Sequence, residues 1–328
     1  MKVISQYIVS KKNAGPKAKM DIEKILKDKY NARICTYKIE NNKNRAIKKY
    51  LFMRSTFKND DIAIIQLPFT SKIKYLNKIN KKIGIIHDVD GIRFNDTNLL
   101  SKEVKVFNTF NALIVHNDVM MKTLKKAGVT TPMIALNFFD YLIDNGTINS
   151  ENRLGKNPII IYPGNLEKRK SEFLYELDSK KMDFLINVYG PGYDNSNNEK
   201  IVFKGSFSPN ELPYKLYGNL GLVWSGKLDS SDEDIGEKGY NKYNYPHKLS
   251  SYIVAKVPVI VWRKAAVAHI VNKYDIGYVI DNIYDINKLD FSDYDVKKRN
   301  VEKLSQKIMN GYFITNAVEK ALEIIKEK

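Results

Sequence analysis

Three consecutive basic residues, Lys168, Arg169 and Lys170, close the segment "YPGNLEKRK", which directly follows the apolar run "PIIIY". The run predicts a buried strand, and Gly164 and Asn165 predict a tight turn at its end. Like charges repel, so such a cluster is favourable there when an anion lies opposite it. The segment therefore predicts an anion-binding site, against the plainer interpretation of a solvated, charged turn.

A second cation, Lys248, lies in the first turn of a helix predicted to begin near Pro246, in "YPHKLSSYIVAKVPVIV". The helix macrodipole disfavours a cation at this end unless something negative lies opposite, and the free amides there bind anions. Both cationic segments follow strands of one predicted sheet, so a single diphosphate could contact both. In "KGSFSPNEL", Ser208 and Pro209 predict the start of another helix, and Phe207 could stack on a base or pack in the core.

The familiar glycine-rich nucleotide motifs are missing from the chain. No segment reads GxxxxGK[ST], no segment reads GxGxxG, and "YGPGYD" (189–194) is interpreted as a turn. We therefore expect a nucleoside diphosphate that is bound without a glycine-rich cradle.

Short apolar runs alternate with helical patterns along the whole chain. Strands are predicted at residues 2–9, 61–67, 82–87, 111–116, 132–136, 158–163, 183–190, 200–205, 220–226, 257–262 and 276–280. Helices are predicted at 20–30, at 118–128 with Asp118 as N-cap and Gly128 as the stop, and at 315–328. Continuously apolar runs are typical of parallel strands covered on both faces, so the predicted class is α/β, with two doubly wound, Rossmann-like domains.

The length of 328 residues suits two domains. The polar stretch 141–158 predicts the boundary, which gives an N-terminal acceptor-side domain (1–153) and a C-terminal nucleotide-sugar domain (154–310). The amphipathic helix at 311–328 either crosses back to the N-terminal domain or contacts another copy of the chain. The segment 227–246, with an acidic run at 229–234, is long for a connection and predicts a mobile lid.

The composition is that of a folded, basic protein: 43% of residues are hydrophobic, 11% are aromatic, and the net charge is +17. Such a surface attracts nucleic acid, acidic lipid headgroups or phosphorylated small molecules. The single cysteine, Cys35, excludes an internal disulfide and a cysteine-based zinc site. No stretch approaches the roughly 20 apolar residues of a membrane span, so we expect a cytoplasmic protein, with peripheral contact at the inner membrane face left open.

Four segments, "PGNLEK", "SFSPNEL", "LGLVWSG" and "PHKLSSYIVAKVPVIV", occur in an order and spacing that resemble one bacterial family of GT-B glycosyltransferases. It comprises the glucosyltransferases that extend the O-linked GlcNAc of serine-rich-repeat adhesins and the related β-1,6-galactofuranosyltransferases. "NAGPKAKMDI", "IIQLP" and "IIHDVDGIRF" extend the resemblance over the first half. The resemblance implies a GT-B fold with two domains facing a cleft, a UDP-sugar donor, a glycan, glycoprotein or lipid-linked sugar acceptor, and a homo-oligomer.

The family's nucleotide-binding residues carry over onto both halves of the chain. The basic residue that meets the diphosphate is usually Arg and falls on Lys168, with Arg169 beside it. The stacking aromatic residue, commonly Tyr, is Phe207. The other positions implied by the resemblance are Gly15, Pro16, Lys17, Gly164, Asn165, Pro246, His247, Lys248, Leu249, Ser250 and Ser251.

Sugar transfer requires stabilisation of the departing UDP and removal of a proton from the acceptor hydroxyl. Preorganised cations and helix amides can supply the first without a metal, so we expect neither a metal nor another cofactor. The resemblance implies an inverting reaction, which needs a base in the N-terminal domain. Asp88 is the first choice, with Asp90 and His87 behind it, although Asp88 could equally cap a helix.

Two other functions remain open at this point. The net charge of +17 would suit a nucleic-acid-binding protein, but the charge is spread along the chain and no such motif is present. A degenerate GT-B subunit that only holds an active partner is the other alternative. The sequence does not distinguish glucose from galactofuranose, and it leaves the acceptor and the linkage open.

Overall fold

The computed structural model describes residues 1–8, 15–39, 45–58, 62–69, 73–144, 148, 154–155, 157–228 and 237–327. They form two compact units: unit 1 is Met1–Asp140 with Gly311–Lys328, and unit 2 is Tyr141–Asn310. The acidic run 229–234 lies outside the described residues, as do the first two residues of "NAGPKAK".

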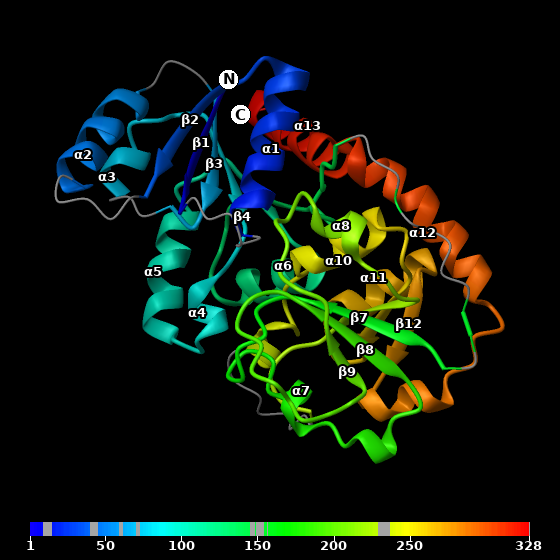
Figure 1. Cartoon of the computed structure of the whole chain (residues 1–328). Helices are drawn as coiled ribbons and strands as arrows, with labels where there is room; N and C mark the ends of the chain where they lie inside the picture. Colours follow the sequence, from blue (N-terminus) through cyan, green and yellow to red (C-terminus); the bar gives the residue numbers. More distant parts are fainter. Residues whose placement is uncertain are drawn as a thin grey trace. The chain divides into compact units, whose positions relative to one another are not determined.

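Unit 1 is built on a six-stranded parallel sheet (Figure 1). Its strands, in spatial order, are β2 (Arg33–Lys38), β1 (Lys2–Tyr7), β3 (Ala63–Leu67), β4 (Lys82–Ile86), β5 (Ala112–Val115) and β6 (Met133–Ala135). Its helices are α1 (Gly15–Tyr30), α2 (Arg45–Thr56), α3 (Ile73–Leu76), α4 (Asp90–Arg93), α5 (Thr97–Phe107), α6 (Asp118–Lys126) and α13 (Tyr312–Lys326). The central strands β3, β4 and β5 are buried at every residue, which confirms the prediction from their continuously apolar sequences.

Strand β2, "RICTYK", is not among the predicted strands. Among the described residues this strand pairs with β1 and lies at the edge of the sheet, so most of its residues are half-buried or exposed. An edge strand lacks the uninterrupted apolar run by which the other strands were recognised. Its β-branched and aromatic residues, Ile34, Thr36 and Tyr37, were the available signal.

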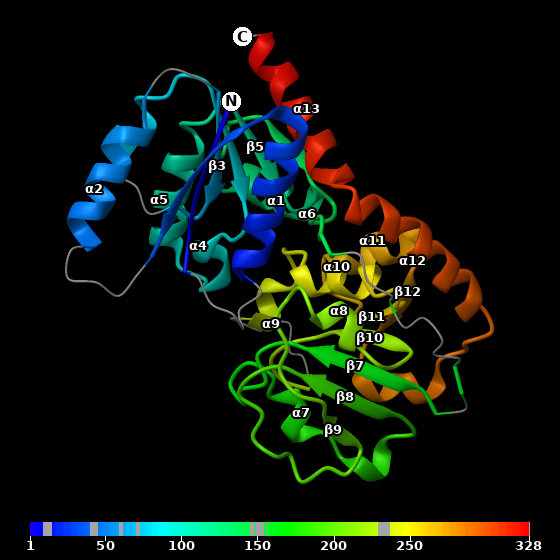
Figure 2. The ribbon, with the colours of Figure 1, turned by 45° about the horizontal axis from the view of Figure 1, so that its top comes forward.

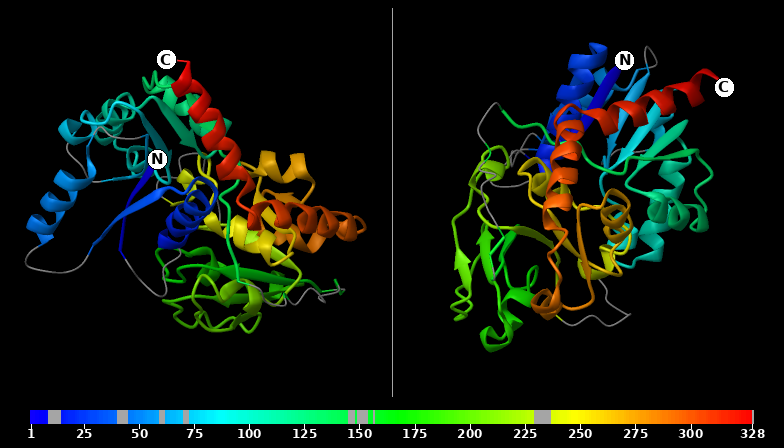
Figure 3. Two further views of the ribbon diagram at one scale, coloured as in Figure 1. Left: turned by 90° about the horizontal axis from the view of Figure 1, so that it is seen from above. Right: turned by 90° about the vertical axis from the view of Figure 1, so that its right-hand side faces the viewer.

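Helix α13 returns to unit 1 at the end of the chain, where it packs against β5, β6 and α1 (Figure 3). The carboxylate of Asp140 accepts backbone N–H bonds from Phe313 (3.2 Å) and Ile314 (2.6 Å), in the first turn of this helix. The Phe313 ring also packs against Phe138, with ring centroids 5.0 Å apart. Both contacts fasten the start of α13 to the segment that follows β6.

Unit 2 carries a second six-stranded parallel sheet (Figure 2). Its strands, in spatial order, are β12 (Gly277–Ile280), β11 (Val259–Trp262), β10 (Leu220–Val223), β7 (Ile159–Pro163), β8 (Leu185–Tyr189) and β9 (Ile201–Phe203). Its α-helices are α7 (Phe173–Glu176), α8 (Leu212–Lys215), α9 (Glu237–Tyr240), α10 (His247–Val254), α11 (Val267–Tyr274) and α12 (Tyr294–Met309), and η1 (Ser179–Lys181) and η2 (Ile283–Lys288) are 3-10 helices.

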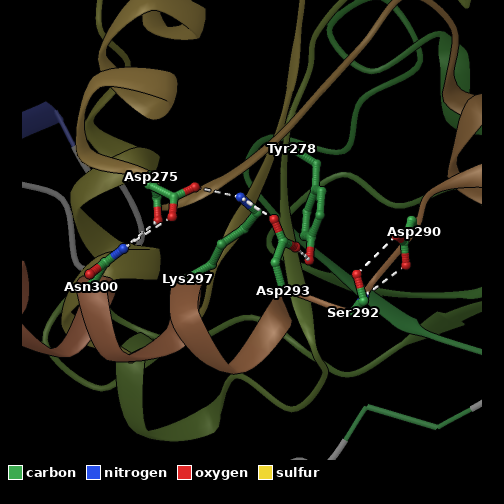
Figure 4. Close-up of polar contacts among 7 residues, drawn as sticks. All are labelled: Asp275, Tyr278, Asp290, Ser292, Asp293, Lys297 and Asn300. Atoms are coloured by element: carbon green, nitrogen blue, oxygen red, sulfur yellow. Dashed lines mark hydrogen bonds and ion pairs between the residues drawn. The ribbon is translucent and has the colours of Figure 1, made fainter.

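Helix α12 is fixed to the β12 side of unit 2 by the nearly buried Lys297 (Figure 4). Its ammonium group lies 2.5 Å from Asp275 and 2.9 Å from Asp293, and Asp293 also accepts the hydroxyl hydrogen bond of Tyr278 at 2.9 Å. Burial acts to lower the pKa of Lys297, but the hydrogen bonds to the two carboxylates leave that pKa above its ordinary value. The cluster is an internal ion-pair network of the fold.

The predicted N-cap of one helix and the predicted start of another are wrong. Asn117 rather than Asp118 is the N-cap of α6, because its side chain accepts the N–H of Met120; Gly128, at φ 100°, ends that helix as predicted. Helix α8 begins at Leu212 rather than near Ser208, because Ser208 and Glu211 first close a turn of their own through mutual hydrogen bonds.

Candidate functional site

The strand order of unit 2 is that of a Rossmann sheet. Its first strand, β7, lies between the second, β8, and the fourth, β10, so the order reverses between β7 and β10. In open α/β sheets, ligands bind outside the carboxyl ends of the strands at this switch point. The residues after β7 and β10 are therefore those to examine for a ligand site.

The turns after β7, β8 and β9 continue the hydrogen bonding of the sheet beyond the ends of the strands. Gly164 donates its N–H to Tyr189 (2.9 Å), and Gly190 donates to Gly205 (3.0 Å). A Cβ on Gly190 would lie 1.9 Å from the carbonyl oxygen of Gly164, and Gly190 has φ 133°. Only glycine fits there, because the two turns touch through their backbones.

Helix α10 presents its N-terminus at the same edge of the sheet. It begins at His247 with Pro246 as N-cap, as predicted, and the N-cap makes no side-chain capping hydrogen bond. Lys248 lies in the first turn, where its ammonium nitrogen is 4.0 Å from the ring centroid of Tyr162 and 3.5 Å from where a Cβ on Gly164 would lie. The structure thus brings Lys248 to the turn after β7.

Buried hydroxyl groups hold α10 and its lysine in place. Tyr252 donates to the carbonyl oxygens of Ile161 in β7 (3.0 Å) and Leu222 in β10 (2.8 Å), directly across the switch point. Its ring packs on Gly221, where a Cβ would lie 2.4 Å from the ring. The hydroxyl of Tyr162 likewise bonds to Ser171 at 2.9 Å, which orients the ring beneath Lys248.

The basic residues of "LEKRK" lie further out than Lys248. Lys168 and Arg169 are exposed, and the guanidinium Nε of Arg169 lies 3.0 Å from the carboxylate of Glu167. Asn165 accepts the N–H of Glu167 at 2.9 Å and so shapes the turn. The structure places these two cations on the same strand-end turn as Gly164, but facing solvent.

The remaining predicted residues of unit 2 divide into two groups. Phe207 is half-buried, 6.4 Å from the ring of Tyr189, and the ring of His247 stacks on Tyr141 at 4.7 Å. Three α10 residues have almost fully buried side chains and pack within the fold: Leu249, Ser250 and Ser251. The last of them donates its hydroxyl to the carbonyl oxygen of Lys248 at 2.7 Å.

In unit 1 the first turn of α1 holds the predicted N-terminal segment. Gly15 begins the helix, and Pro16 and Lys17 are buried. The ammonium group of Lys17 lies 2.6 Å from the carboxylate of Asp21, with both side chains less than a tenth exposed. This ion pair satisfies the charge of Lys17 within its own helix.

A chain of polar groups crosses the carboxyl end of the unit 1 sheet. His87, just after β4, makes a 2.8 Å hydrogen bond through Nε2 to the side-chain oxygen of Gln66 in β3, and the amide nitrogen of Gln66 donates to Ser5 in β1 at 2.7 Å. His116, after β5, bonds the carbonyl oxygen of His87 at 3.0 Å. Burial lowers the pKa of His116 to about 4, so this imidazole is neutral near pH 7.

The two aspartates of "DVD" have different surroundings. Asp88 forms an ion pair with Arg93 at 2.9 Å, and about a third of its side chain is exposed. Asp90 begins α4, and its backbone N–H donates to Glu103 at 2.9 Å. Burial raises the pKa of Glu103, against the effect of this bond and of a similar bond from Gly91.

Lys19, from α1, is a buried cation beside this chain of polar groups. Its ammonium group donates to the carbonyl oxygen of Gln6 at 2.9 Å. Burial lowers the pKa of Lys19 to about 8, although the charges of Asp88 and Glu23 act to raise it. A buried amine near a carboxylate at the end of a sheet is typical of a functional site.

Among the residues that the structure describes, no group of three or more His, Cys, Asp or Glu side chains is placed to hold a metal ion. Within the same residues, no helix is both long enough and apolar enough to cross a bilayer.

The two halves of the sequence match the two domains of one protein family. Residues 1–138 match the glucosyltransferase 3-like N-terminal domain, and residues 160–321 match the glucosyltransferase 3-like C-terminal domain. The chain belongs to the glucosyltransferase 3-like family. It is 29% identical over 338 residues to the β-1,6-galactofuranosyltransferase WbbI of Escherichia coli (strain K12), with 97% of each chain covered.

Solved structures with low sequence identity share the fold of this glucosyltransferase 3-like chain. Sucrose-phosphate synthase from Thermosynechococcus elongatus matches with a TM-score of 0.66 at 10% identity, and the match covers 100% of both chains. The Anabaena HepE protein in complex with UDP and glucose matches with a TM-score of 0.61 at 11% identity, again over 100% of both chains. The predictions of the family, of a GT-B fold and of a glycosyltransferase are confirmed.

Several residues at the carboxyl edges of the two sheets were not predicted as site residues from the sequence of this glucosyltransferase 3-like chain. Gln66 is a single polar residue inside the buried strand "AIIQL", which was a usable signal. Tyr252 belongs to "HKLSSY", but nothing in the sequence shows that its hydroxyl spans two strands. Lys19 and Arg93 lie in ordinary charged helical segments, where spacing alone does not distinguish them.

Proposed function

We propose that this protein transfers a hexosyl unit, glucose or galactofuranose, from a UDP-sugar to a hydroxyl group of a glycan or of a sugar linked to protein or lipid. One observation carries the proposal. Lys248 lies at the N-terminus of α10, at the switch point of the unit 2 sheet, with its ammonium group over Tyr162 and beside Gly164. A helix N-terminus with a lysine in its first turn suits a diphosphate.

In the donor site, the amides of α10 and the ammonium group of Lys248 contact the diphosphate. Lys168 and Arg169 approach it from the turn after β7, and Arg169 exchanges Glu167 for a phosphate oxygen when UDP binds. Phe207 supplies an aromatic face to the uracil ring. These cations and amides stabilise the charge on departing UDP, so the transfer proceeds without a metal ion or another cofactor.

In unit 1, Asp88 is the proposed base. Its Oδ1 contacts Arg93, and the other carboxylate oxygen takes the proton of the acceptor hydroxyl. The acceptor oxygen then bonds to the anomeric carbon as the bond from that carbon to UDP breaks, which inverts the configuration. His87 is bound to Gln66, and Asp90 starts a helix, so both are placed second to Asp88 as the base.

The proposal extends to the compartment, the oligomeric state and the membrane contact of the protein. The protein acts in the cytoplasm as a homo-oligomer, in peripheral contact with an anionic membrane that carries the acceptor. The net charge of +17 supports this contact, because a basic surface is attracted to anionic headgroups.

A thermal-shift panel of nucleotides and UDP-sugars tests the donor site. UDP at a hundredfold excess over its Kd should stabilise the protein by about 2.7 kcal/mol. Lys248→Met should weaken UDP binding about 10- to 150-fold, because a charge-assisted hydrogen bond is lost, whereas Lys303→Met, an exposed lysine of α12, should leave it unchanged.

Asp88→Asn tests the base. It should still bind UDP, yet consume UDP-sugar with an acceptor at least a hundredfold more slowly. UDP binding without consumption by the unaltered protein would support the inactive-subunit alternative. Salt-dependent DNA binding without any effect of UDP would support the nucleic-acid alternative and would refute the proposal.

A further inference from the structure

Helix α2 carries apolar side chains on both of its faces. The inner face is anchored by Phe52, whose ring lies 5.5 Å from Tyr37 of β2 and 6.5 Å from Phe69, and by Met53, which is 3% exposed. A surface helix typically buries one apolar stripe against the core, and Phe52 and Met53 form that stripe in α2. A second apolar stripe on the same helix is therefore available for contact with another partner.

That second stripe consists of Ile47, Tyr50 and Leu51, whose side chains are 63%, 53% and 57% exposed. Residues spaced i, i+3 and i+4 lie on one face of a helix, so the three side chains are neighbours. Figures 1 and 3 show α2 at the outer margin of unit 1, beside the edge strand β2. The stripe is thus an exposed apolar surface on an element that projects at the side of the sheet.

The charged residues of α2 indicate what kind of surface the apolar stripe contacts. Residues 45–58 contain five Lys or Arg residues and no Asp or Glu. Arg54 continues the stripe one turn beyond Tyr50 and Leu51, and Lys48 is exposed on its flank. A symmetric contact between two copies would bring these cations face to face, which is unfavourable, whereas an anionic bilayer complements both the cations and the apolar side chains.

We propose that α2 docks unit 1 on an anionic lipid bilayer. Ile47, Tyr50 and Leu51 enter the boundary between headgroups and acyl chains, and Lys48 and Arg54 contact lipid phosphates. Three apolar side chains give weak, reversible binding alone, so the cations supply the second signal. The inference rests on the proposed function only in what the docking would serve, namely access to an acceptor at the membrane. The docking itself is tested by vesicle binding, which is measured without sugar transfer.

Flotation of the full chain with vesicles tests the proposal. The protein should float with vesicles of equal parts phosphatidylglycerol and phosphatidylcholine at low salt, and neither at high salt nor with phosphatidylcholine alone. Lys48→Gln with Arg54→Gln should weaken binding about 25-fold, at about fivefold per cation. Ile47→Ser, Tyr50→Ser and Leu51→Ser together should weaken it at least tenfold.

Matched controls are available on other elements. Leu185→Ser with Val296→Ser removes exposed apolar side chains of unit 2, and Lys303→Gln with Lys320→Gln removes the same charge from α12 and α13. All variants should keep the melting temperature and the rate of UDP-sugar consumption with a water-soluble acceptor. Equal losses in the controls would overturn the proposal.

A second result would also overturn it. If the serine variant of α2 binds vesicles as the unaltered protein does but changes the oligomeric state in sedimentation velocity, the stripe is a contact between copies. Absence of UDP-sugar consumption with intact vesicle binding would instead count against the proposed function alone.

Discussion

Asp140 gives unit 1 an unusual dependence of stability on pH. Its side chain is 1% exposed, and its two carboxylate oxygens accept the N–H groups of Phe313 and Ile314. Burial, with a smaller contribution from the charge of Asp21, raises its pKa to about 7 against the lowering effect of the two N–H groups. In unfolded chain the carboxyl group returns to its ordinary pKa, so the folded and unfolded states differ in bound protons.

The direction and the size of the change in unfolding free energy with pH follow from this difference in bound protons. Between the unfolded pKa of 3.8 and the folded pKa of about 7, the folded state holds a proton that the unfolded state has released. The stabilising contribution of Asp140 to the free energy of unfolding is therefore complete below pH 3.8. It falls as pH rises from 3.8 to about 7 and is constant above the folded pKa. At about 1.36 kcal/mol per pH unit over roughly three units, the loss is roughly 4 kcal/mol.

The variant Asp140→Asn should remove this dependence. The amide cannot ionise, and its nitrogen faces a backbone donor, so the variant carries a constant penalty of about 1–3 kcal/mol at all pH values. Urea unfolding of both proteins from pH 4 to pH 8, followed by a probe in unit 1, gives the difference in unfolding free energy. The unfolding free energy of the unaltered protein minus that of the variant should fall by roughly 4 kcal/mol as pH rises, change sign because the loss exceeds the penalty of about 1–3 kcal/mol, and level off above pH 7. A constant or rising difference would refute the reasoning.

Three further substitutions test the construction of unit 2. Gly190→Ala should lower stability by about 2–4 kcal/mol and weaken UDP binding, because its Cβ would overlap a backbone oxygen at 1.9 Å, while Gly155→Ala, with open space around it, should be neutral by urea unfolding. Tyr252→Phe should cost about 1–3 kcal/mol, since two buried carbonyl groups lose their donor; an unchanged melting temperature would contradict this. Lys297→Met should cost about 2 kcal/mol, against almost nothing for the exposed Lys303→Met on the same helix, and equal effects would contradict the ion-pair network.

Much of the fold could be predicted from the sequence because its central strands are covered on both faces. Runs such as those of β3, β5, β10 and β11 contain almost nothing but apolar residues, and each proved to be a buried parallel strand. The edge strand β2 lacks such a run. The N-cap of α6 was predicted at Asp118 instead of Asn117 because the two adjacent residues are of types that cap equally well.

The site could be predicted only in part. The helix start at Pro246 and the position of Lys248 follow from local rules on helix ends, and the structure has both. The contact of Lys248 with Tyr162 depends on how α10 lies on the sheet, which Tyr252 determines across two strands. Contacts between residues so far apart in the chain carry no local signal.

The late return of α13 to unit 1 has a consequence for synthesis on the ribosome. Domains usually fold as they emerge, the N-terminal one first. Here β5, β6 and α1 lack the helix that covers them until all of unit 2 has been translated, because α13 follows unit 2 in the chain. Unit 2 is therefore the first unit whose described elements are all present, and the nascent protein keeps an uncovered apolar surface on unit 1 until α13 has left the exit tunnel.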